Sequence, residues 1–157
     1  LAVVRDSKEI PESKRDAVFE LIQSVAASVS VVIVPAAEVD ARGVHAANLD
    51  GMRRAVQGLD VEPAYVLTDG YAIEGLGVPN LAVWKGDQVV VSISAASVIA
   101  KVTRDRIMRE MDQEFPLYGF AGHKGYITAA HTQALNEHGP CAQHRTSFAN
   151  VAALIHK

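Results

Sequence analysis

The sequence predicts an α/β domain in which a central mixed β-sheet is flanked by helices. Short runs of β-branched residues alternate along the chain with longer segments whose apolar residues recur at helical spacing. The length of 157 residues suits one domain, residues 1–157, with a single hydrophobic core. The composition, 49% apolar and 21% charged, is that of an ordinary globular protein rather than of a disordered or membrane-embedded chain.

The first third of the chain predicts a helix, a strand and a helix. A helix is expected over residues 11–27, because Pro11 suits a first helical turn and apolar residues follow at intervals of three and four. Residues 29–34 are nearly all β-branched and are bounded by Pro35, so they predict a buried strand. A second helix is expected over residues 45–59, which have an apolar face.

The middle of the chain predicts three short strands. Residues 64–68 form an apolar run that ends at Asp69-Gly70. Residues 80–84 and 88–93 predict a pair of strands around the turn Lys85-Gly86-Asp87. A sheet of ordinary width would contain more strands than these.

The remaining elements are helices. One is expected from residue 94 to about residue 111, with Ser94 as its N-cap. Another is expected over residues 128–138, closed by Gly139-Pro140.

Composition also bears on location and partners. No apolar run approaches the roughly 20 residues of a membrane helix, and charged residues come too early for a signal peptide, so we expect no membrane partner. The single Cys141 excludes an internal disulfide and fits a cytoplasmic protein. The net charge of −3 does not by itself favour a polyanion, although residues 101–157 carry 7 basic and 5 acidic side chains.

Two aspartates follow predicted strands. Asp69 comes directly after residues 64–68, and Asp87 follows residues 80–84. Ligands of α/β proteins bind at the carboxyl ends of strands, and Mg²⁺ or Mn²⁺ prefers carboxylate oxygens, as in metal-ion hydrolysis of a phosphodiester. Each aspartate also fits a simple turn, so the alternative is that neither is functional.

The helix expected from residue 94 opens with small side chains. Its thin first turns allow either close packing on the sheet or the approach of a nucleic-acid backbone, with Ser97 and Lys101 meeting phosphate. Asp105 on the same helix is a candidate third acid, but "TRDR" is more typical of a solvated, salt-bridged helix face.

The stretch "YGFAGHKGYITAAH", residues 118–131, combines aromatic, basic and glycine residues before a helix. Such a loop can stack on a sugar or base and bind phosphate. The alternative is a structured loop whose aromatic side chains cover the edge of the core.

A zinc site is a competing hypothesis. His138, Cys141 and His144 have the spacing His-x-x-Cys-x-x-His, and His131 lies two helical turns earlier. These residues are of the types that zinc binds, but no second cysteine completes a closed site of four ligands.

Taken together, these stretches resemble bacterial ribonuclease HII, the type 2 ribonuclease H. No single block is specific, whereas their order over nearly the whole chain is. The matching blocks are RDSKEIPESKR, AAEVDARGVHAANLDGMRRAV, YVLTDG, KGD, SISAASVIAKVTRDR, YGFAGHKGYITAAH and EHGPCAQHRTSF.

The resemblance implies an RNase H-like fold and an endonuclease that hydrolyses the RNA strand of RNA–DNA hybrids and cuts 5′ to single ribonucleotides embedded in DNA. It implies four carboxylates that bind two ions of Mn²⁺ or Mg²⁺ for hydrolysis by two-metal-ion catalysis. Asp69 matches the third of these and Asp87 the fourth, whereas Asp105 matches none. Tyr126 matches the tyrosine that stacks on the deoxyribose at the RNA–DNA junction.

The resemblance also suggests how the substrate is held. We expect a monomer in which residues 112–157 form a helical, substrate-binding part of the domain. The side chains expected to contact the nucleic-acid backbone are Lys8, Lys101, Lys124, Ser7 and Ser97.

The sequence departs from the family pattern at its start. The family's first two acids lie in a stretch Asp-Glu-x-Gly-Arg-Gly, which the printed sequence lacks. The stretch is unobserved, removed, or lost from the natural chain, and the retention of Asp69, Asp87 and Tyr126 favours the first two explanations. In the third case the protein would be a hybrid-binding module with an impaired metal site.

Overall fold

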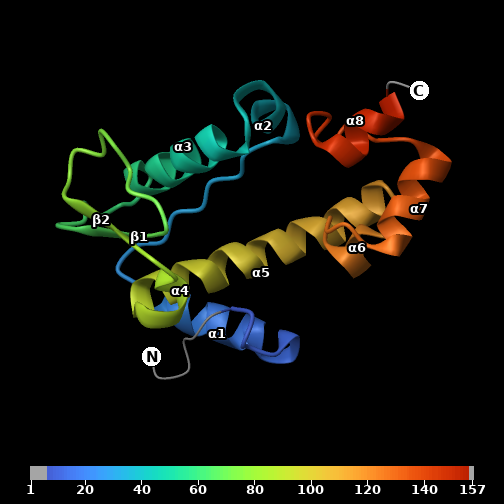
Figure 1. Ribbon diagram of the computed structural model, residues 1–157. Helices are drawn as coiled ribbons and strands as arrows, with labels where there is room; N and C mark the ends of the chain where they lie inside the picture. The colour runs from blue at the N-terminus through green and yellow to red at the C-terminus, as the bar shows by residue number, and fades with distance from the viewer. Residues whose placement is uncertain (1–6, 156–157) are drawn as a thin grey trace. The chain divides into compact units, whose positions relative to one another are not determined.

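The computed structural model describes residues 7–155 (Figure 1). The chain divides into two compact units. The described residues of the first unit lie within 1–33 and 48–102. Those of the second unit lie within 34–47 and 103–157. Two of the three boundaries, after residues 47 and 102, fall within helices, since α3 spans Val44–Gln57 and α5 spans Val91–Glu114.

The first unit contains a small parallel sheet. Strand β1, Val66–Asp69, pairs with β2, Asn80–Val83, so that Asp69 lies opposite Val83. The side-chain amide of Asn80 bonds both the N–H and the carbonyl of Ile73, at 3.0 and 2.9 Å, and Ile73 is only 2% exposed. These contacts fix the connection between the strands and therefore the register that aligns their carboxyl ends.

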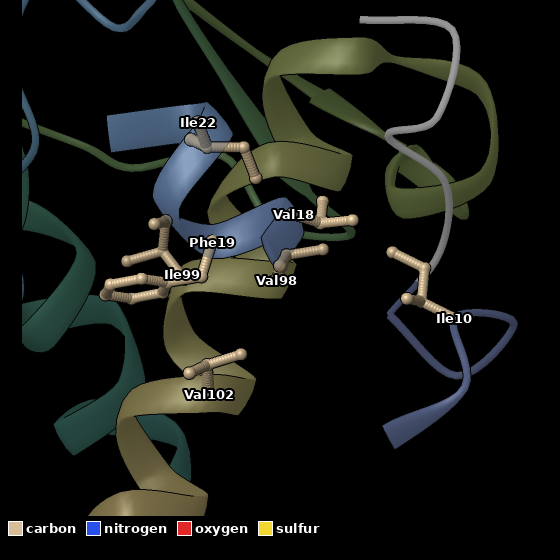
Figure 2. Packing of buried hydrophobic residues seen from close by; sticks show 7 residues of the cluster. All are labelled: Ile10, Val18, Phe19, Ile22, Val98, Ile99 and Val102. Atoms are coloured by element: carbon tan, nitrogen blue, oxygen red, sulfur yellow. The ribbon is translucent and has the colours of Figure 1, made fainter. Parts of the chain in front are cut away.

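A helical core stabilises this unit. Helix α1, Glu12–Val25, packs on the first turns of α5 through β-branched and aromatic side chains (Figure 2). Val98 at the centre is fully buried, and burying such a side chain contributes about 1.5–3 kcal/mol. The members of the cluster are Ile10, Val18, Phe19, Ile22, Val98, Ile99 and Val102.

The regular secondary structure in the described part of the second unit is all helical. Besides the C-terminal part of α5 it contains four shorter helices and a core of Met108, Tyr118, Phe120 and Leu135. Its helices are α2, Ala36–Arg42; α6, Phe120–His123; α7, Ala129–His138; and α8, Ala149–Ile155.

A carboxylate in α2 connects this helix to the C-terminal segment of the same unit. Asp40 accepts hydrogen bonds from the backbone N–H groups of Thr146 and Ser147, at 2.7 and 3.0 Å, and from both hydroxyls, at 2.8 and 2.6 Å. These four bonds hold the pKa of the Asp40 carboxyl well below its usual range, with the Ser147 hydroxyl the largest contributor.

Several sequence predictions are confirmed. The predicted helices at 11–27, 45–59 and 128–138 correspond to α1, α3 and α7, and the strands at 64–68 and 80–84 correspond to β1 and β2. Helix α7 has Thr128 as its N-cap, whose hydroxyl accepts from the N–H of His131 at 3.2 Å, and Gly139 as its C-cap.

The strand predicted at residues 29–34 is wrong. The segment has no ladder partner among the described residues, and Val29, Val31 and Ile33 are 37%, 46% and 63% exposed. β-Branched residues favour a strand only where a neighbouring strand and a packed face complete it.

The strand predicted at residues 88–93 is also wrong. Helix α4, Gly86–Val89, occupies its start, and α5 begins at Val91. A short apolar run satisfies helix and strand patterns equally, and here the helix prevails. Ser94 is therefore not an N-cap: its hydroxyl lies inside α5 and donates to the carbonyls of Val90 and Asp87.

No helix in the part of the chain that the structure describes has the length and apolar character needed to cross a membrane.

Candidate functional site

The two predicted acids lie at the same edge of the sheet in the first unit. Asp69 is the last residue of β1, and Asp87 lies four positions beyond the end of the neighbouring parallel strand β2. The backbone N–H of Gly86 donates to Oδ1 of Asp69 at 2.9 Å. The Asp69 carboxylate thus contacts the backbone of Gly86, the residue that immediately precedes Asp87.

The turn that carries Asp87 is tightly constrained. Lys85 adopts a left-handed conformation, with φ of 51°, and starts helix α4. A Cβ atom added at Gly86 would lie 2.4 Å from Cδ1 of Ile93, so a larger residue requires the Ile93 side chain in α5 to shift. Asp87 is 9% exposed, and its carbonyl accepts a bond of 2.6 Å from the Ser94 hydroxyl. The position of this acid is therefore fixed by α5.

A segment from the start of the described chain lies beside these groups. Nζ of Lys8 is 3.7 Å from Oδ2 of Asp87, and the Lys8 side chain is 80% exposed. The hydroxyls of Ser7 and Ser97 are 2.9 Å apart, and Nε of Arg15 donates to the Ser7 carbonyl at 3.2 Å. The amine of Lys8 and the hydroxyls of Ser7 and Ser97 therefore lie near the buried Asp87.

Helix α5 presents one stripe of polar side chains. Ser94, Ser97 and Lys101 are spaced by three and four residues and so share a face. Ser94 contacts the backbone of Asp87, and Ser97 contacts Ser7. Lys101 is half-buried one turn further along. Of the eight predicted site residues, the first unit contains Asp69, Asp87, Ser7, Lys8, Ser97 and Lys101.

The other two predicted site residues, Lys124 and Tyr126, belong to the second unit. They lie in the loop after α6, where Lys124 is left-handed with φ of 52°. Its carbonyl accepts from Nη2 of Arg104 at 3.1 Å, and its Nζ donates to the Ala121 carbonyl. Tyr126 is 60% exposed. The loop is ordered by its own bonds and by α5, and it leaves the tyrosine ring accessible.

Asp105 is buried in the second unit, at 3% exposure. It does not lie on the solvated helix face that "TRDR" indicated.

The histidines of the zinc hypothesis form a different arrangement. Nε2 of His131 lies 3.1 Å from Nε2 of His144, and the Cys141 sulfur lies 3.1 Å from Nδ1 of His144. Nε2 of His138 instead lies 3.9 Å from a carboxylate oxygen of Glu137. Within residues 7–155, no three His, Cys, Asp or Glu side chains are grouped as a metal site, so the zinc hypothesis gains no support.

Sequence reasoning did not identify two sets of contacts. The four hydrogen bonds of Asp40 join positions more than 100 residues apart in the chain. The available signal was the pair Thr146-Ser147, because such residues are common in turns. His123 stacks on His131 with ring centroids 4.1 Å apart, and histidine enrichment after residue 120 was the available signal.

Fold and site together define an α/β protein with two carboxylates at the carboxyl ends of adjacent parallel strands, beside a helix that displays hydroxyl and amine groups. The family model for ribonuclease HII matches residues 1–151, and the chain therefore belongs to the ribonuclease HII family. The resemblance noted from the sequence blocks is confirmed.

Individual relatives agree. The chain is 59% identical to ribonuclease HII of Parafrankia sp. (strain EAN1pec) over 149 residues, which are 95% of this chain and 62% of the relative. It is 56% identical to that of Saccharopolyspora erythraea over 94% of the chain and 65% of the relative. For Acidothermus cellulolyticus the values are 57%, 96% and 49%. The chain thus spans about half to two thirds of the length of these relatives.

The fold is also that of a solved structure. The crystal structure of ribonuclease H2 from Pyrococcus horikoshii OT3 superposes with a TM-score of 0.80 at 22% identity, covering 97% of this chain and 80% of that chain. The predicted α/β, RNase H-like fold is confirmed, and the sheet within the described residues consists of two parallel strands.

Proposed function

We propose that the protein is an endonuclease that hydrolyses the RNA strand of RNA–DNA hybrids and cuts 5′ to single ribonucleotides embedded in duplex DNA. The observation that carries this proposal is the placement of Asp69 and Asp87 at one sheet edge in a chain of the ribonuclease HII family. Cytoplasmic location and a monomeric state stay predictions alongside it.

Asp69 and Asp87 are the proposed ligands of a divalent metal, Mn²⁺ or Mg²⁺. The donor set fits, because such ions take one or two carboxylates and complete their shell with water and substrate phosphate oxygens. Asp69 is exposed, while the buried Asp87 is oriented by its helix. When bound, the metal supplies Lewis acidity toward water and toward the leaving 3′-oxygen.

The polar groups around Asp87 are proposed to hold the scissile strand. Lys8 pairs with Asp87 at 3.7 Å while remaining largely exposed, and an ion pair of this kind is worth little energetically. A phosphate can therefore recruit Lys8 at small cost. The hydroxyls of Ser7 and Ser97 and the amine of Lys101 provide further phosphate donors from the same unit.

Lys124 and Tyr126 are proposed to read the nucleic acid through the second unit. An aromatic ring that is 60% exposed on an ordered loop can stack on a sugar or base. A flat ring accepts a deoxyribose, which lacks the 2′-hydroxyl that distinguishes RNA from DNA. Lys124, two residues earlier in the chain, is proposed to meet the adjoining phosphate.

The experiment that tests this function compares three labelled duplexes with the complete polypeptide in Mn²⁺ and in Mg²⁺. The substrates are an RNA–DNA hybrid, a DNA duplex with one ribonucleotide, and the matched all-DNA duplex. We expect the hybrid to be cut, and the second duplex to be cut 5′ to the ribonucleotide with a 3′-hydroxyl and a 5′-phosphate, while the all-DNA duplex stays intact. Binding without cleavage at saturating Mn²⁺ would instead support a hybrid-binding module.

A further inference from the structure

The second unit contains a chain of hydrogen bonds that runs through two buried histidines to the proposed junction tyrosine. The backbone N–H of Cys141 donates to Nδ1 of His144 at 3.0 Å. Nε2 of His144 meets Nε2 of His131 at 3.1 Å. Nδ1 of His131 then lies 3.0 Å from the carbonyl oxygen of Tyr126. His131 and His144 are 5% and 8% exposed.

The backbone groups at the two ends of this chain of hydrogen bonds determine which nitrogen of each imidazole ring carries the proton. An N–H can only donate, so Nδ1 of His144 accepts from Cys141, and the neutral ring carries its proton on Nε2. That proton is donated to Nε2 of His131, whose own proton is then on Nδ1. A carbonyl can only accept, so this last N–H donates to Tyr126. Every member of the chain is satisfied only when both rings are neutral.

A third histidine secures the other end of the same loop. His123 stacks on His131 with ring planes 10° apart, accepts from the N–H of Gly125 at 3.1 Å, and lies 2.7 Å from the Tyr118 carbonyl through Nε2. The ring of Phe120 packs edge-on against both His123 and His131. The backbone from residue 118 to residue 126 is therefore held by imidazole groups at both ends.

We propose that His131 and His144 are positioning residues, which as a neutral pair hold the Tyr126 backbone for a nucleic-acid duplex and release it when either ring is protonated. This inference rests on the proposed function, because it takes Tyr126 as the substrate contact. A proton added to His131 sets two N–H donors against each other across the 3.1 Å contact. A proton added to His144 sets its Nδ1–H against the N–H of Cys141.

The surroundings of the pair favour the neutral state. The titratable groups that face it are His123 from α6, Tyr118 from the segment before α6, and Cys141 from the loop after α7. Burial lowers the pKa of both His131 and His144, and His123 lowers both further. In the part of the chain that the structure describes, no carboxylate is among the groups that shift either pKa.

The test measures KM and kcat against pH on the duplex with one ribonucleotide. His144→Phe removes the donor to His131, and we expect KM to rise about fivefold with kcat little changed, the effect of one lost hydrogen bond. His144→Gln keeps an amide donor and should restore KM. His131→Asn keeps a donor for the Tyr126 carbonyl but does not titrate, so it should reduce the acid rise in KM of the wild type to the part that protonation of His144 causes. His45→Gln, an exposed histidine in α3, is the control.

Two further readouts keep the outcomes separate. Duplex affinity without divalent metal, read by fluorescence anisotropy, gives the same comparison independently of cleavage. Histidine ¹⁵N spectra report the tautomers, which we expect to be Nδ1–H for His131 and Nε2–H for His144. A wild type that never cuts the ribonucleotide duplex would remove the proposed function alone. Affinities and pH profiles of His131→Asn and His144→Phe that match the wild type, or a His131 protonated on Nε2, would overturn the positioning role.

Discussion

Asp69 and Gly86 are joined by a hydrogen bond of 2.9 Å, in which the Gly86 N–H donates to Oδ1 of the carboxylate. The bond crosses from the end of β1 to the turn after β2 and ends one residue before Asp87. One acid therefore positions the backbone that carries the other. The two carboxylates behave as a single structural unit, and several expected results follow from that coupling.

Divalent metal should stabilise the folded protein through these acids. A ligand that binds only the native state adds about 2.7 kcal/mol at a concentration one hundred times its Kd. We expect Mn²⁺ to raise the Tm of the wild type, and Asp69→Asn and Asp87→Asn to lose most of that rise. Glu62→Gln, which neutralises an exposed carboxylate in the loop before β1, serves as the matched control. Equal metal-induced shifts in all four proteins would contradict a metal site at the sheet edge.

Gly86→Ala should destabilise the first unit by about 1–3 kcal/mol, the usual cost of overpacking. The new Cβ would lie 2.4 Å from Cδ1 of Ile93, and Ile93→Val removes that atom. Chemical denaturation of both single variants and the double variant should show that Ile93→Val recovers part of the loss. Gly122→Ala meets nothing within 4 Å and should change stability by less than about 0.5 kcal/mol. Additive effects of the two substitutions would refute the proposed clash.

Asp40→Asn should destabilise the second unit in a pH-dependent way. The carboxylate accepts four hydrogen bonds, and its pKa in the folded state lies well below the usual 3.8. The unfolded state therefore binds a proton more readily, so the stability that Asp40 contributes is present above about pH 3.8 and is lost as the pH falls below it.

Thermal unfolding between pH 7 and pH 3 checks this expectation. The difference in Tm between wild type and Asp40→Asn should be largest at neutral pH and should shrink in acid. Glu38→Gln lies on the same helix and removes a charge that pairs with Arg42 at 3.0 Å, an ion pair between helical neighbours that is worth little, so we expect a small effect. A Tm difference that grows in acid would show that the pKa of Asp40 is not lowered by folding.

The buried histidine pair should make the protein less stable in mild acid. Folding lowers the pKa of His131 and His144 below the ordinary 6.5, chiefly through burial, so the unfolded state binds more protons. Their contribution is complete above about pH 6.5 and declines as the pH falls. Urea unfolding at pH 7.5 and pH 5.5 should show a smaller acid loss for His131→Asn than for the wild type and for the control His45→Gln. Parallel pH profiles for all three proteins would contradict this.

The sequence was informative where local chemistry and tertiary structure agree. Asp69 and Asp87 could be placed at strand ends because apolar runs stop at them and turn residues adjoin them. Helix α7 could be bounded because Thr128 and Gly139 are strong capping residues. In these cases the deciding interactions lie within a few residues of each other.

The remaining features depend on contacts that a pattern does not encode. Residues 88–93 alternate too little to separate helix from strand, and the bond from Ser94 to the Asp87 carbonyl accompanies the helical outcome. His131 and His144 suggested zinc by spacing, whereas their rings meet each other directly. The residue types indicated which side chains lie near one another. The tertiary structure was needed to show how these side chains interact.

We propose that Asp69 and Asp87 form a metal-dependent centre that cuts beside a ribonucleotide. The most direct measurement is the single-turnover rate of cleavage, in Mn²⁺, of a DNA duplex with one ribonucleotide, for wild type, Asp69→Asn and Glu62→Gln. Asn keeps an acceptor for the Gly86 N–H but removes the charge, so we expect a loss of roughly a hundredfold or more with the fold retained, while Glu62→Gln cuts at the wild-type rate. Undiminished cleavage by folded Asp69→Asn would show that Asp69 is not a ligand of the catalytic metal.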